Sequence, residues 1–492
     1  MPSPQTMNTR ANPMAFTRRQ MLQQAGSGAG MLGLISLLND QGLLTSAKAQ
    51  PSASNPMAAR QPHFAPKAKR VIWLFINGGP SQVDTFDYKP ELAKRDGQEL
   101  EGFDANTGFF ANAVGPLMKS PWAFRRYGQS GKWVSDLFPH MAQHVDKMAF
   151  IHSCYSSSNN HSPALFKMNT GHMQMGYPCV GSWATYGLGA TTQNLPGFVV
   201  MSDPLGRGLP KGYTQNWSAG FLPSVYQGTW LRPSGDPILN LYRHDQHDDP
   251  RQRRQLDLLR ELNEGRIDVE STEDTELAAR IESFELAYRM QTAAPEALNV
   301  EAESQHIQQL YGLDDDKCSH FGRQCLTARR MVERGVRFVQ IYSGGEENQR
   351  SWDGHNDIEG NHGGFAAETD KPIAGLLADL QQRGMLEDTL VIWGGEFGRL
   401  PLTQKADKPG RDHNPHAFTV WMAGAGIKGG TSYGESDEIG HKAANNPVDI
   451  HDLHATILHL LGMDHERLTF LHNGRRFRLT DVSGNVVTPI LT

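Results

Sequence analysis

Short apolar runs that alternate with helical segments restrict the fold of this chain more than any other feature. Each run is bounded by glycine, asparagine or other polar residues, as buried strands are. A helical pattern over 371–383 leads into one of these runs, and a long polar loop over 344–364 precedes that helix. The alternation predicts an α/β fold, with a mostly parallel central sheet flanked by helices. The predicted strands are 71–76, 147–152, 196–201, 336–342, 389–393 and 418–422.

The middle of the chain differs in composition from the segments on either side. From about residue 237 to residue 334, charged residues recur at helical spacing, as in 251–262, 273–290 and 318–334. We interpret this segment as a helical insertion in one large α/β domain that spans 67–492. A linker rich in proline, serine and alanine, about residues 50–66, precedes that domain.

The first 49 residues have the pattern of a signal peptide. The sequence TRRQ at 17–20 contains a twin-arginine pair, an apolar and glycine-rich stretch follows over 25–38, and AKA at 47–49 is a small-residue cleavage pattern. We predict export by the twin-arginine route, with cleavage after Ala49, to the periplasm or the extracellular space. The alternative is an uncleaved membrane anchor, for which the stretch is short. No later run is long and apolar enough for a transmembrane segment in the mature chain.

The net charge argues against nucleic acid as a partner, and the cysteine spacing argues against a zinc–thiolate site. The formal net charge of the 492 residues is −6, and no basic tract is present. Nucleic acid is therefore not an expected partner. The four cysteines contain no C-x2-C pair, which argues against a zinc–thiolate site; an oxidising compartment permits disulfides, but the spacing does not select a pairing. These cysteines are Cys154, Cys179, Cys318 and Cys325.

Candidate metal ligands gather at the ends of the predicted strands. Glu396 follows two glycines after the 389–393 run, and chemistry in α/β sheets collects at the carboxyl ends of strands. His413 and His416 precede the 418–422 run, so we expect them to reach back to that edge through a loop. The other polar residues at strand ends or in adjoining loops are Asn77, Asp84, Asp87, His161, Asp353, His355 and His362.

The mixture of imidazoles and carboxylates predicts a divalent metal cofactor. Such mixed sets suit zinc, manganese or iron, whereas oxygen-only sets suit calcium or magnesium, so zinc or manganese is favoured over calcium. The spacing leaves the choice between His355 and His362 open, and likewise the choice between His413 and His416, because loop geometry decides both.

Arginine and serine residues near these ligands have two interpretations each. Arg399 and Arg411 suit a bidentate grip on a substrate anion, or an ion pair with a carboxylate. Ser162 is better suited to capping a helix that starts at Pro163 than to acting as a nucleophile.

Five motifs taken together resemble the alkaline phosphatase and sulfatase superfamily. The resemblance is closest to an exported branch, the family called domain of unknown function 1501 (DUF1501). It implies an alkaline-phosphatase-like α/β fold and metal-dependent hydrolysis of a phosphate or sulfate ester. The motifs are NGGPSQVDTFD at 77–87, WDGH at 352–355, TLVIWGGEFGRLP at 389–401, GRDHNPHAF at 410–418 and VDIHDLHATILHLLGMD at 448–464.

The resemblance assigns roles to individual residues. Asn77 stands where relatives have the first metal-binding acid, and Asp353 with His355 resembles an acid-plus-histidine pair that binds one metal. Glu396 is followed by Phe397 where relatives have a second polar ligand, so the acid is kept and its neighbour is lost. His413 stands where phosphatase-like members have another histidine ligand. The resemblance thus implies one metal site and an incomplete second one, with Asp84 as an alternative ligand.

The position of the sulfatase nucleophile departs from the family pattern. HSPALFKMNTG at 161–171 lies over the sulfatase motif C-x-P-S-R, so that His161 replaces the cysteine and Leu165 replaces the arginine. Formylglycine chemistry is excluded, because its maturation requires cysteine or serine. His161 then attacks the ester, or binds metal and transfers protons, or belongs to a site that no longer hydrolyses. We favour the second role, since a histidine among other ligands is more often a ligand or acid–base group.

The sequence as a whole predicts an exported, metal-dependent hydrolase of phosphate or sulfate esters. Its expected partner is an anionic ester substrate such as a sulfated or phosphorylated glycan. The alternative is a noncatalytic sulfatase-like protein that binds an anionic glycan or an exported protein partner.

Overall fold

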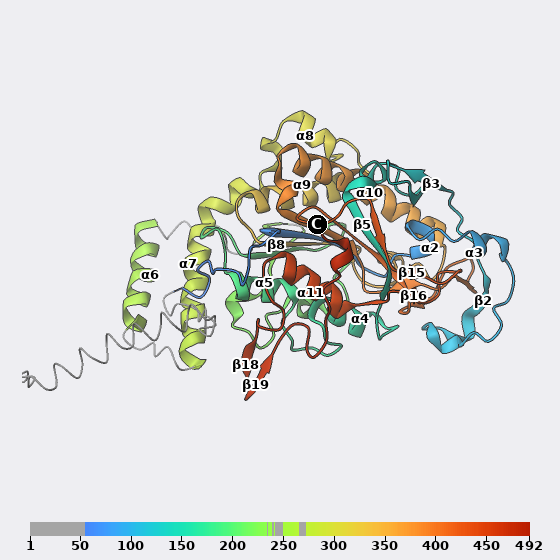
Figure 1. Ribbon diagram of the computed structural model, residues 1–492. Coiled ribbons are helices and arrows are strands. Elements are labelled where there is room, and N and C mark those ends of the chain that lie inside the picture. Colours follow the sequence, from blue (N-terminus) through green and yellow to red (C-terminus); the bar gives the residue numbers. More distant parts are fainter. Residues whose placement is uncertain (1–54, 234, 239–240, 242–248, 265–271) are drawn as a thin grey trace, which may run out of the picture. The chain divides into compact units, whose positions relative to one another are not determined.

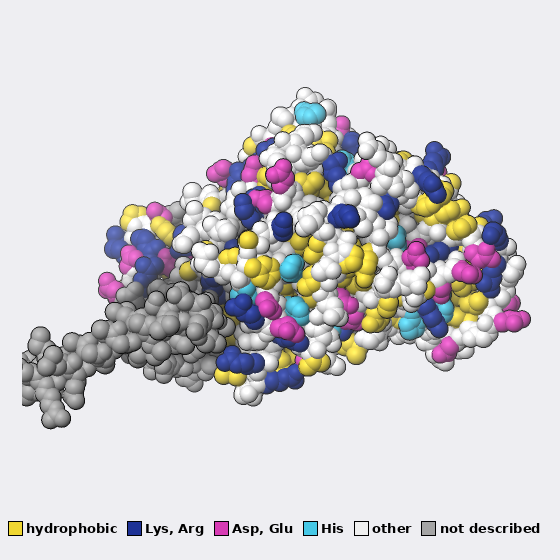
Figure 2. All heavy atoms as spheres, viewed as in Figure 1, with side chains coloured by type: hydrophobic (Ala, Val, Ile, Leu, Met, Phe, Trp, Pro, Cys, Tyr) yellow, Lys and Arg dark blue, Asp and Glu magenta, His cyan; other side chains and the backbone are white. Residues whose placement is uncertain are grey.

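The computed structural model describes residues 55–233, 235–238, 241, 249–264 and 272–492. The predicted signal peptide and the first part of the linker lie outside the described residues. Within these ranges, no helix combines the length and the apolar character that crossing a bilayer requires. On the face seen in Figure 2, described basic and acidic side chains are interspersed rather than gathered into one basic surface.

A nine-stranded sheet forms the centre of the fold, in the order β14-β5-β13-β9-β1-β8-β6-β7, with β17 beside β5. Every pair is parallel except the two that β13 makes with β5 and β9. The predicted α/β class with a mostly parallel sheet is therefore confirmed. The strands are β1 (Arg70–Ile76), β5 (Met148–Tyr155), β6 (Phe198–Met201), β7 (Thr229–Leu231), β8 (Phe338–Ser343), β9 (Thr389–Gly394), β13 (Phe418–Ala423), β14 (Thr431–Tyr433) and β17 (Val448–Asp449).

Helices cover both faces of this sheet (Figure 1). Alternate residues of β1 point into two separate cores, since Ile72 and Leu74 belong to one and Val71 and Trp73 to the other. The first core contains α9 (Ser319–Glu333) and α10 (Ile358–Gln382), and the second contains α4 (His161–Thr170), α5 (Val180–Leu188) and α11 (Ile450–Leu460). A strand buried on both faces is continuously apolar, which explains the runs in the sequence.

The segment predicted to be a helical insertion contains α6 (Asp249–Glu264), α7 (Thr272–Leu298), α8 (Gln305–Leu310) and α9. Helix α9 packs on the sheet, with Phe321, Cys325 and Leu326 in the first core. The four cysteines are all buried and free.

Helix α10 begins well before the helix predicted from residue 371. Asp357 caps it by accepting a hydrogen bond from the backbone N–H of Gly360 at 3.1 Å. The glycines of this first part lower its intrinsic helix propensity, but Ile358 and Phe365 are buried and Phe365 joins the first core. The predicted polar loop over 344–364 therefore ends at Asp357.

Short elements outside the central sheet complete the fold. Four antiparallel pairs are β2 (Val114–Leu117) with β11 (Leu402–Gln404), β3 (Phe124–Tyr127) with β4 (Lys132–Ser135), β15 (Glu435–Ser436) with β16 (Ala443–Asn445), and β18 (Phe470–His472) with β19 (Arg475–Phe477). A fifth pair joins β10 (Gly398–Arg399) to β12 (His413–Asn414), and the short helices α2 (Gln82–Thr85) and α3 (Pro90–Lys94) follow β1.

Candidate metal centre

The reversed direction of β13 brings His413 to the carboxyl end of the sheet. Because β13 is antiparallel to β9, with Trp421 opposite Trp393, its first residues lie beside the ends of its neighbours. His413 also pairs with Arg399 across β10 and β12. The histidine therefore reaches the site from a strand end like Glu396, and the expectation that it must reach back through a loop is wrong.

His161 enters the site as the first residue of α4. Asn160 is the N-cap of this helix, since its side-chain oxygen accepts the N–H of Ser162 at 3.2 Å, and Ser162 is not the cap as predicted. The imidazole of His161 packs against the buried ring of Phe397, with the ring centroids 4.9 Å apart. The helix start and this apolar contact together fix the direction of the imidazole.

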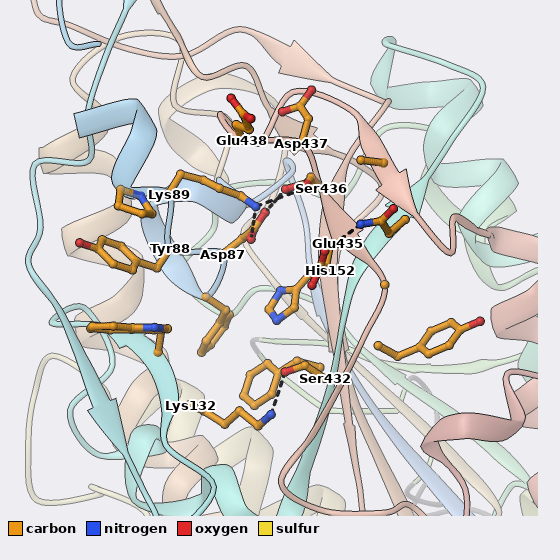
Figure 3. A pocket seen from close by; sticks show the side chains of 18 of the residues that line it. Asp87, Tyr88, Lys89, Lys132, His152, Ser432, Glu435, Ser436, Asp437 and Glu438 are labelled. Atoms are coloured by element: carbon orange, nitrogen blue, oxygen red, sulfur yellow. Dashed lines mark hydrogen bonds and ion pairs between the residues drawn. The ribbon is translucent and has the colours of Figure 1, made fainter. Parts of the chain in front are cut away.

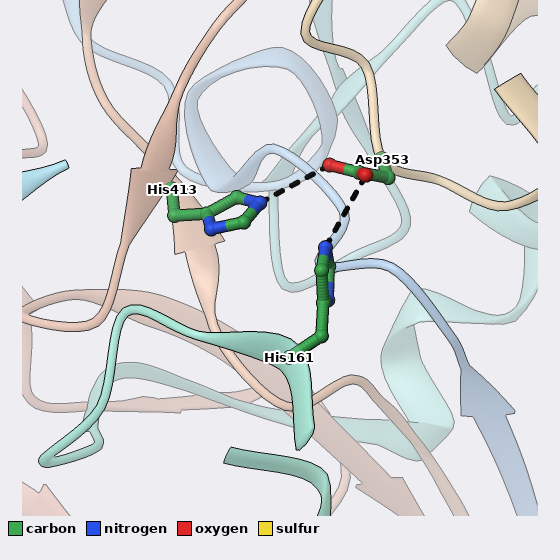
Figure 4. A group of neighbouring side chains, drawn as sticks. All are labelled: His161, Asp353 and His413. Atoms are coloured by element: carbon green, nitrogen blue, oxygen red, sulfur yellow. Dashed lines mark hydrogen bonds and ion pairs between the residues drawn. The ribbon is translucent and has the colours of Figure 1, made fainter. Parts of the chain in front are cut away.

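Asp353 is the centre of the site, and its side chain contacts three imidazoles. Its Oδ1 lies 3.0 Å from His355 Nε2 and 3.2 Å from His413 Nε2, and its Oδ2 lies 3.3 Å from His161 Nε2. Figure 4 shows His161 and His413 pointing at this carboxylate from two different elements. Burial raises the pKa of Asp353, but the charges of Arg399 and His161 outweigh burial and hold the pKa well below its usual range.

Each imidazole has an acceptor at its other nitrogen. His161 Nδ1 lies 2.7 Å from Glu396 Oε1, His355 Nδ1 lies 2.5 Å from Gln404 Oε1, and His413 Nδ1 lies 2.6 Å from the backbone oxygen of Asn159. Carboxylate, amide and peptide oxygens only accept, so we assign the proton of each neutral ring to Nδ1.

This assignment points three Nε2 lone pairs at an anionic carboxylate. His355 Nε2 and His413 Nε2 are also only 2.9 Å from each other. Lone pairs do not hydrogen-bond to lone pairs, so the arrangement needs a cation or an added proton among them. Orientation of ligand imidazoles by an acceptor at Nδ1 is the usual arrangement in metal sites.

Glu396 adds an unpaired acceptor to the same site. The side chain is fully buried, and its Oε1 accepts from the backbone N–H of Gly78 at 3.0 Å as well as from His161. Its Oε2 has no hydrogen-bond partner among the described residues. A buried carboxylate oxygen without a partner is costly, so this atom also favours a cation nearby.

The pKa values describe the site without a metal. Burial lowers the pKa of His161, but Asp353 and Glu396 outweigh burial and raise the pKa to about 9. The pKa of His413 is held well below its ordinary value, by burial first and by the charge of His161 second. Without a metal, one proton is therefore held at His161 while His413 stays neutral.

The donor set fits a divalent metal. His161, Asp353 and His413 offer one group of ligand atoms within 4.8 Å of one another, and His355, Asp412 and His413 offer a second group. Both groups combine nitrogen and oxygen donors, which suits zinc or manganese better than calcium.

Asn77 and His362, two of the remaining predicted ligands, bond to protein groups. Asn77 donates from its side chain to the backbone oxygen of Gly345 at 2.5 Å. His362 has both nitrogens occupied, since Nε2 accepts from Ser81 N–H at 2.9 Å and Nδ1 lies 3.0 Å from Asn361 Oδ1. Burial, the largest cause, lowers the pKa of His362 to about 3.

Two further predicted residues have other surroundings. His416 is exposed, and its ring lies 6.2 Å from that of His441. Asp84 forms an ion pair with Arg411. Of the two open choices, the structure brings His355 and His413, not His362 and His416, to Asp353.

Both predicted anion-binding arginines are fully buried and bound to protein oxygens. Arg399 donates to Asp353 Oδ1 at 2.7 Å and to the backbone oxygen of Gly79 at 2.9 Å. Arg411 donates to both oxygens of Asp84, at 2.7 Å and 3.1 Å. A buried guanidinium requires such countercharges. The two side chains therefore hold carboxylates in position, in contrast to the predicted contact with substrate.

Sequence reasoning missed three residues that orient the histidines. Gln404 and Asn159 lie in or beside loops, and no pattern distinguishes them from other polar loop residues. Asp412 accepts the backbone N–H of His413 at 2.7 Å, and its Oδ1 lies 3.6 Å from His355 Nδ1. Its place directly before His413 is the one signal that could have identified it.

A large polar cleft of about 1480 Å³ lies elsewhere on the molecule (Figure 3). Two of its lysines have partners, with Lys89 3.0 Å from Asp87 and Lys132 Nζ donating to Ser432 Oγ at 2.9 Å. Of the polar residues that the sequence places at strand ends, Asp87 lines it, and the residues around Asp353 do not. The cleft is therefore separate from the histidine–carboxylate cluster.

Comparisons with known proteins give one family match. A family model described as "Protein of unknown function (DUF1501)" matches residues 68–491. No curated protein is significantly similar in sequence.

Solved structures that resemble the chain share little sequence with it. The PsFucS1 sulfatase from Pseudoalteromonas sp. is 14% identical, with a TM-score of 0.34, over 83% of this chain and 69% of that one. The phosphonate monoester hydrolase SpPMH from Silicibacter pomeroyi is 10% identical, with a TM-score of 0.36, over 86% and 76%. The alkaline phosphatase from the Antarctic bacterium TAB5 is 12% identical, with a TM-score of 0.31, over 77% and 97%.

Proposed function

Since the chain belongs to the DUF1501 family, whose name assigns no activity, we propose a function from its own site: an exported, metal-dependent hydrolase of phosphate or sulfate esters. We infer export by the twin-arginine route from the signal-peptide pattern of residues 1–49. The expected substrate is an anionic ester, such as a sulfated or phosphorylated glycan.

One observation carries the proposal, namely the convergence of three imidazole Nε2 atoms on one buried carboxylate. His355, His413 and His161 all lie within 3.3 Å of an oxygen of Asp353. A site built only for stability would satisfy these atoms with protein donors, as buried polar groups usually are. The Nδ1 proton assignment turns their lone pairs toward Asp353 and toward one another, which is the arrangement of ligands around a cation.

The residues have separate roles in this proposal. His161, Asp353 and His413 hold the metal, with His355 and Asp412 as further ligands. When bound there, a divalent metal polarises an ester oxygen and lowers the pKa of water. Glu396, Gln404 and the Asn159 carbonyl keep the three imidazoles in the ligating tautomer.

The surroundings of His161 favour an anionic ester. The residue opens α4, and a helix N-terminus attracts negative charge. Phe397 packs against His161 and His413, with ring centroids 4.9 Å and 4.5 Å away, and excludes water from that side. His161 also contacts Glu396, so it can pass a proton between the site and that carboxylate.

A noncatalytic protein is the second candidate, and Phe397 favours it. The fully buried ring occupies the side of His413 where a further polar ligand would complete a second metal position. A protein of this kind would keep the metal to bind an anionic glycan or an exported partner without turnover.

Metal analysis combined with hydrolysis assays separates these candidates. We expect protein purified from metal-replete medium to carry zinc or manganese and to hydrolyse an aryl phosphate or an aryl sulfate. Asp353→Asn should lose the metal and at least about 100-fold in rate, because it removes the charge that all three imidazoles share. Asp87→Asn is the matched control, since Asp87 pairs with Lys89 in the separate cleft. Absence of bound metal would refute the hydrolase, and metal without turnover would support the noncatalytic protein.

A further inference from the structure

Two adjacent aromatic side chains lie at the edge of the histidine cluster. Phe109 and Phe110 are 48% and 44% exposed, in the loop between the short 3-10 helices Ala105–Thr107 and Ala111–Ala113. The ring centroid of Phe110 is 4.9 Å from that of His355, and the centroid of Phe109 is 5.7 Å from that of His413. Single exposed aromatics are common on protein surfaces, but these two are neighbours and both contact candidate ligands.

The loop that carries them is attached to the residues that orient the ligands. The backbone N–H of Phe110 donates to Asp412 Oδ2 at 2.7 Å, and the side chain of Asn159 donates to the backbone oxygen of Gly108 at 2.7 Å. A Cβ atom at Gly108 would lie 2.4 Å from Asp412 Oδ2, so a larger residue there would displace the Asp412 carboxylate. Because Asn159 also accepts from His413, the loop and the ligand are fixed by the same residue.

The two rings are perpendicular, with centroids 5.1 Å apart and planes at 81°. The face of one ring and the edge of the other therefore lie side by side, as an apolar surface next to a polar cluster. Small-molecule sites commonly combine an apolar or aromatic wall with a few polar groups that fix orientation.

We propose that Phe109 and Phe110 form the subsite for the alcohol part of the ester, and that they select esters whose alcohol carries a ring. The inference rests on the proposed function, because the anionic group of the same molecule must reach the histidines. A pyranose or aryl ring presents a flat apolar face of a size that covers both side chains. A short alkyl group leaves them in water and gains little from them.

Two non-hydrolysable anions test this subsite without turnover. Phenylphosphonate and methylphosphonate carry the same charged group and differ in the ring. We expect calorimetry on the zinc-loaded protein to give about three- to tenfold tighter binding of phenylphosphonate. Phe109→Ala and Phe110→Ala should reduce this preference to near unity and leave the affinity for methylphosphonate unchanged.

Two further variants control for loop folding and for general loss of apolar surface. Phe110→Leu keeps apolar volume without the ring, so it should lose most of the preference while holding the loop. Leu471→Ala removes another exposed apolar side chain, 55% exposed on β18, and should keep the native preference. A native protein without preference for phenylphosphonate, or variants that retain it, would overturn the subsite. A protein that keeps the ring preference but hydrolyses no ester would overturn the hydrolase alone.

Discussion

Asp353 and Asp84 are two buried acids that follow strands β8 and β1, and the structure pairs them in opposite ways. Asp84 is 0% exposed, and Arg411 contacts both of its oxygens while the hydroxyl of Ser81 donates to Oδ2 at 2.6 Å. Asp353 is 1% exposed and has one guanidinium contact, from Arg399, beside its three imidazoles.

The difference lies in the chemistry of the partner. A guanidinium is permanently charged and presents only donors, so its bidentate pair with Asp84 leaves no acceptor that needs a cation. An imidazole can be neutral and then offers a lone pair, so the three around Asp353 leave a place for a metal or a proton. Two acids equally buried thus serve separate purposes, one structural and one available for chemistry.

The largest expected effect comes from breaking the Asp84–Arg411 pair. Arg411→Met removes the charge that compensates a fully buried carboxylate, and we expect the free energy of unfolding to fall by about 3 to 5 kcal/mol. Urea denaturation at neutral pH measures this loss. Metal content per folded chain should stay at the native value, because the side chain of Arg411 pairs with Asp84, outside the three imidazoles around Asp353.

The double variant Asp84→Leu with Arg411→Met is the control for that loss. It removes both charges from the interior, so most of the lost stability should return. If the single variant were as stable as the native protein, Asp84 would not depend on Arg411, and its contrast with Asp353 would fail.

A smaller effect is expected at Glu396, the acid beside the proposed metal site. Glu396→Gln retains an oxygen to accept from His161 and Gly78 but removes the negative charge. We expect metal affinity to fall by about 10- to 100-fold, with little change in folding, because a carboxylate at Nδ1 raises the basicity of the ligand imidazole. Competition against a chelator gives the affinity.

The same substitution at Glu368 provides the comparison. This carboxylate pairs with Arg207 at 2.7 Å, so Glu368→Gln should leave metal affinity unchanged. Equal losses in the two variants would mean that general charge, and not the contact with His161, controls the site.

The sheet could be read from the sequence because its strands are buried on both faces and therefore appear as apolar runs. Every predicted run overlaps a strand of the sheet. The direction of β13 could not be predicted, since an apolar run carries no information on orientation. That direction determines how His413 reaches the site, so the position of this ligand could not be derived from the strand pattern.

Motif position identified Glu396, Asp353, His355, His413 and His161, and the structure brings these five together. The roles of the arginines were not predictable in the same way. Asp84 and Arg411 are 327 residues apart in sequence, so no local pattern indicates that they pair. The same limit applies to Phe109 and Phe110, which contact the histidines only through tertiary structure.

The smallest predicted effect uses acid pH to isolate Asp84. Burial raises its pKa, but the charge and hydrogen bonds of Arg411 and the hydroxyl of Ser81 outweigh burial and lower the pKa below 3.8. A carboxyl with a depressed pKa in the folded state contributes stability that is complete above its unfolded pKa and is lost as the pH falls through its folded pKa.

The native protein should therefore lose more stability below about pH 4 than the Asp84→Leu, Arg411→Met double variant. Other carboxyls titrate in both proteins, so the difference between their urea denaturation curves reports on Asp84. An equal loss of stability in the native protein and the double variant would mean that Arg411 does not stabilise the ionised form of Asp84. The charge of Asp84 would then be uncompensated by Arg411 and, like that of Asp353, available to another cation.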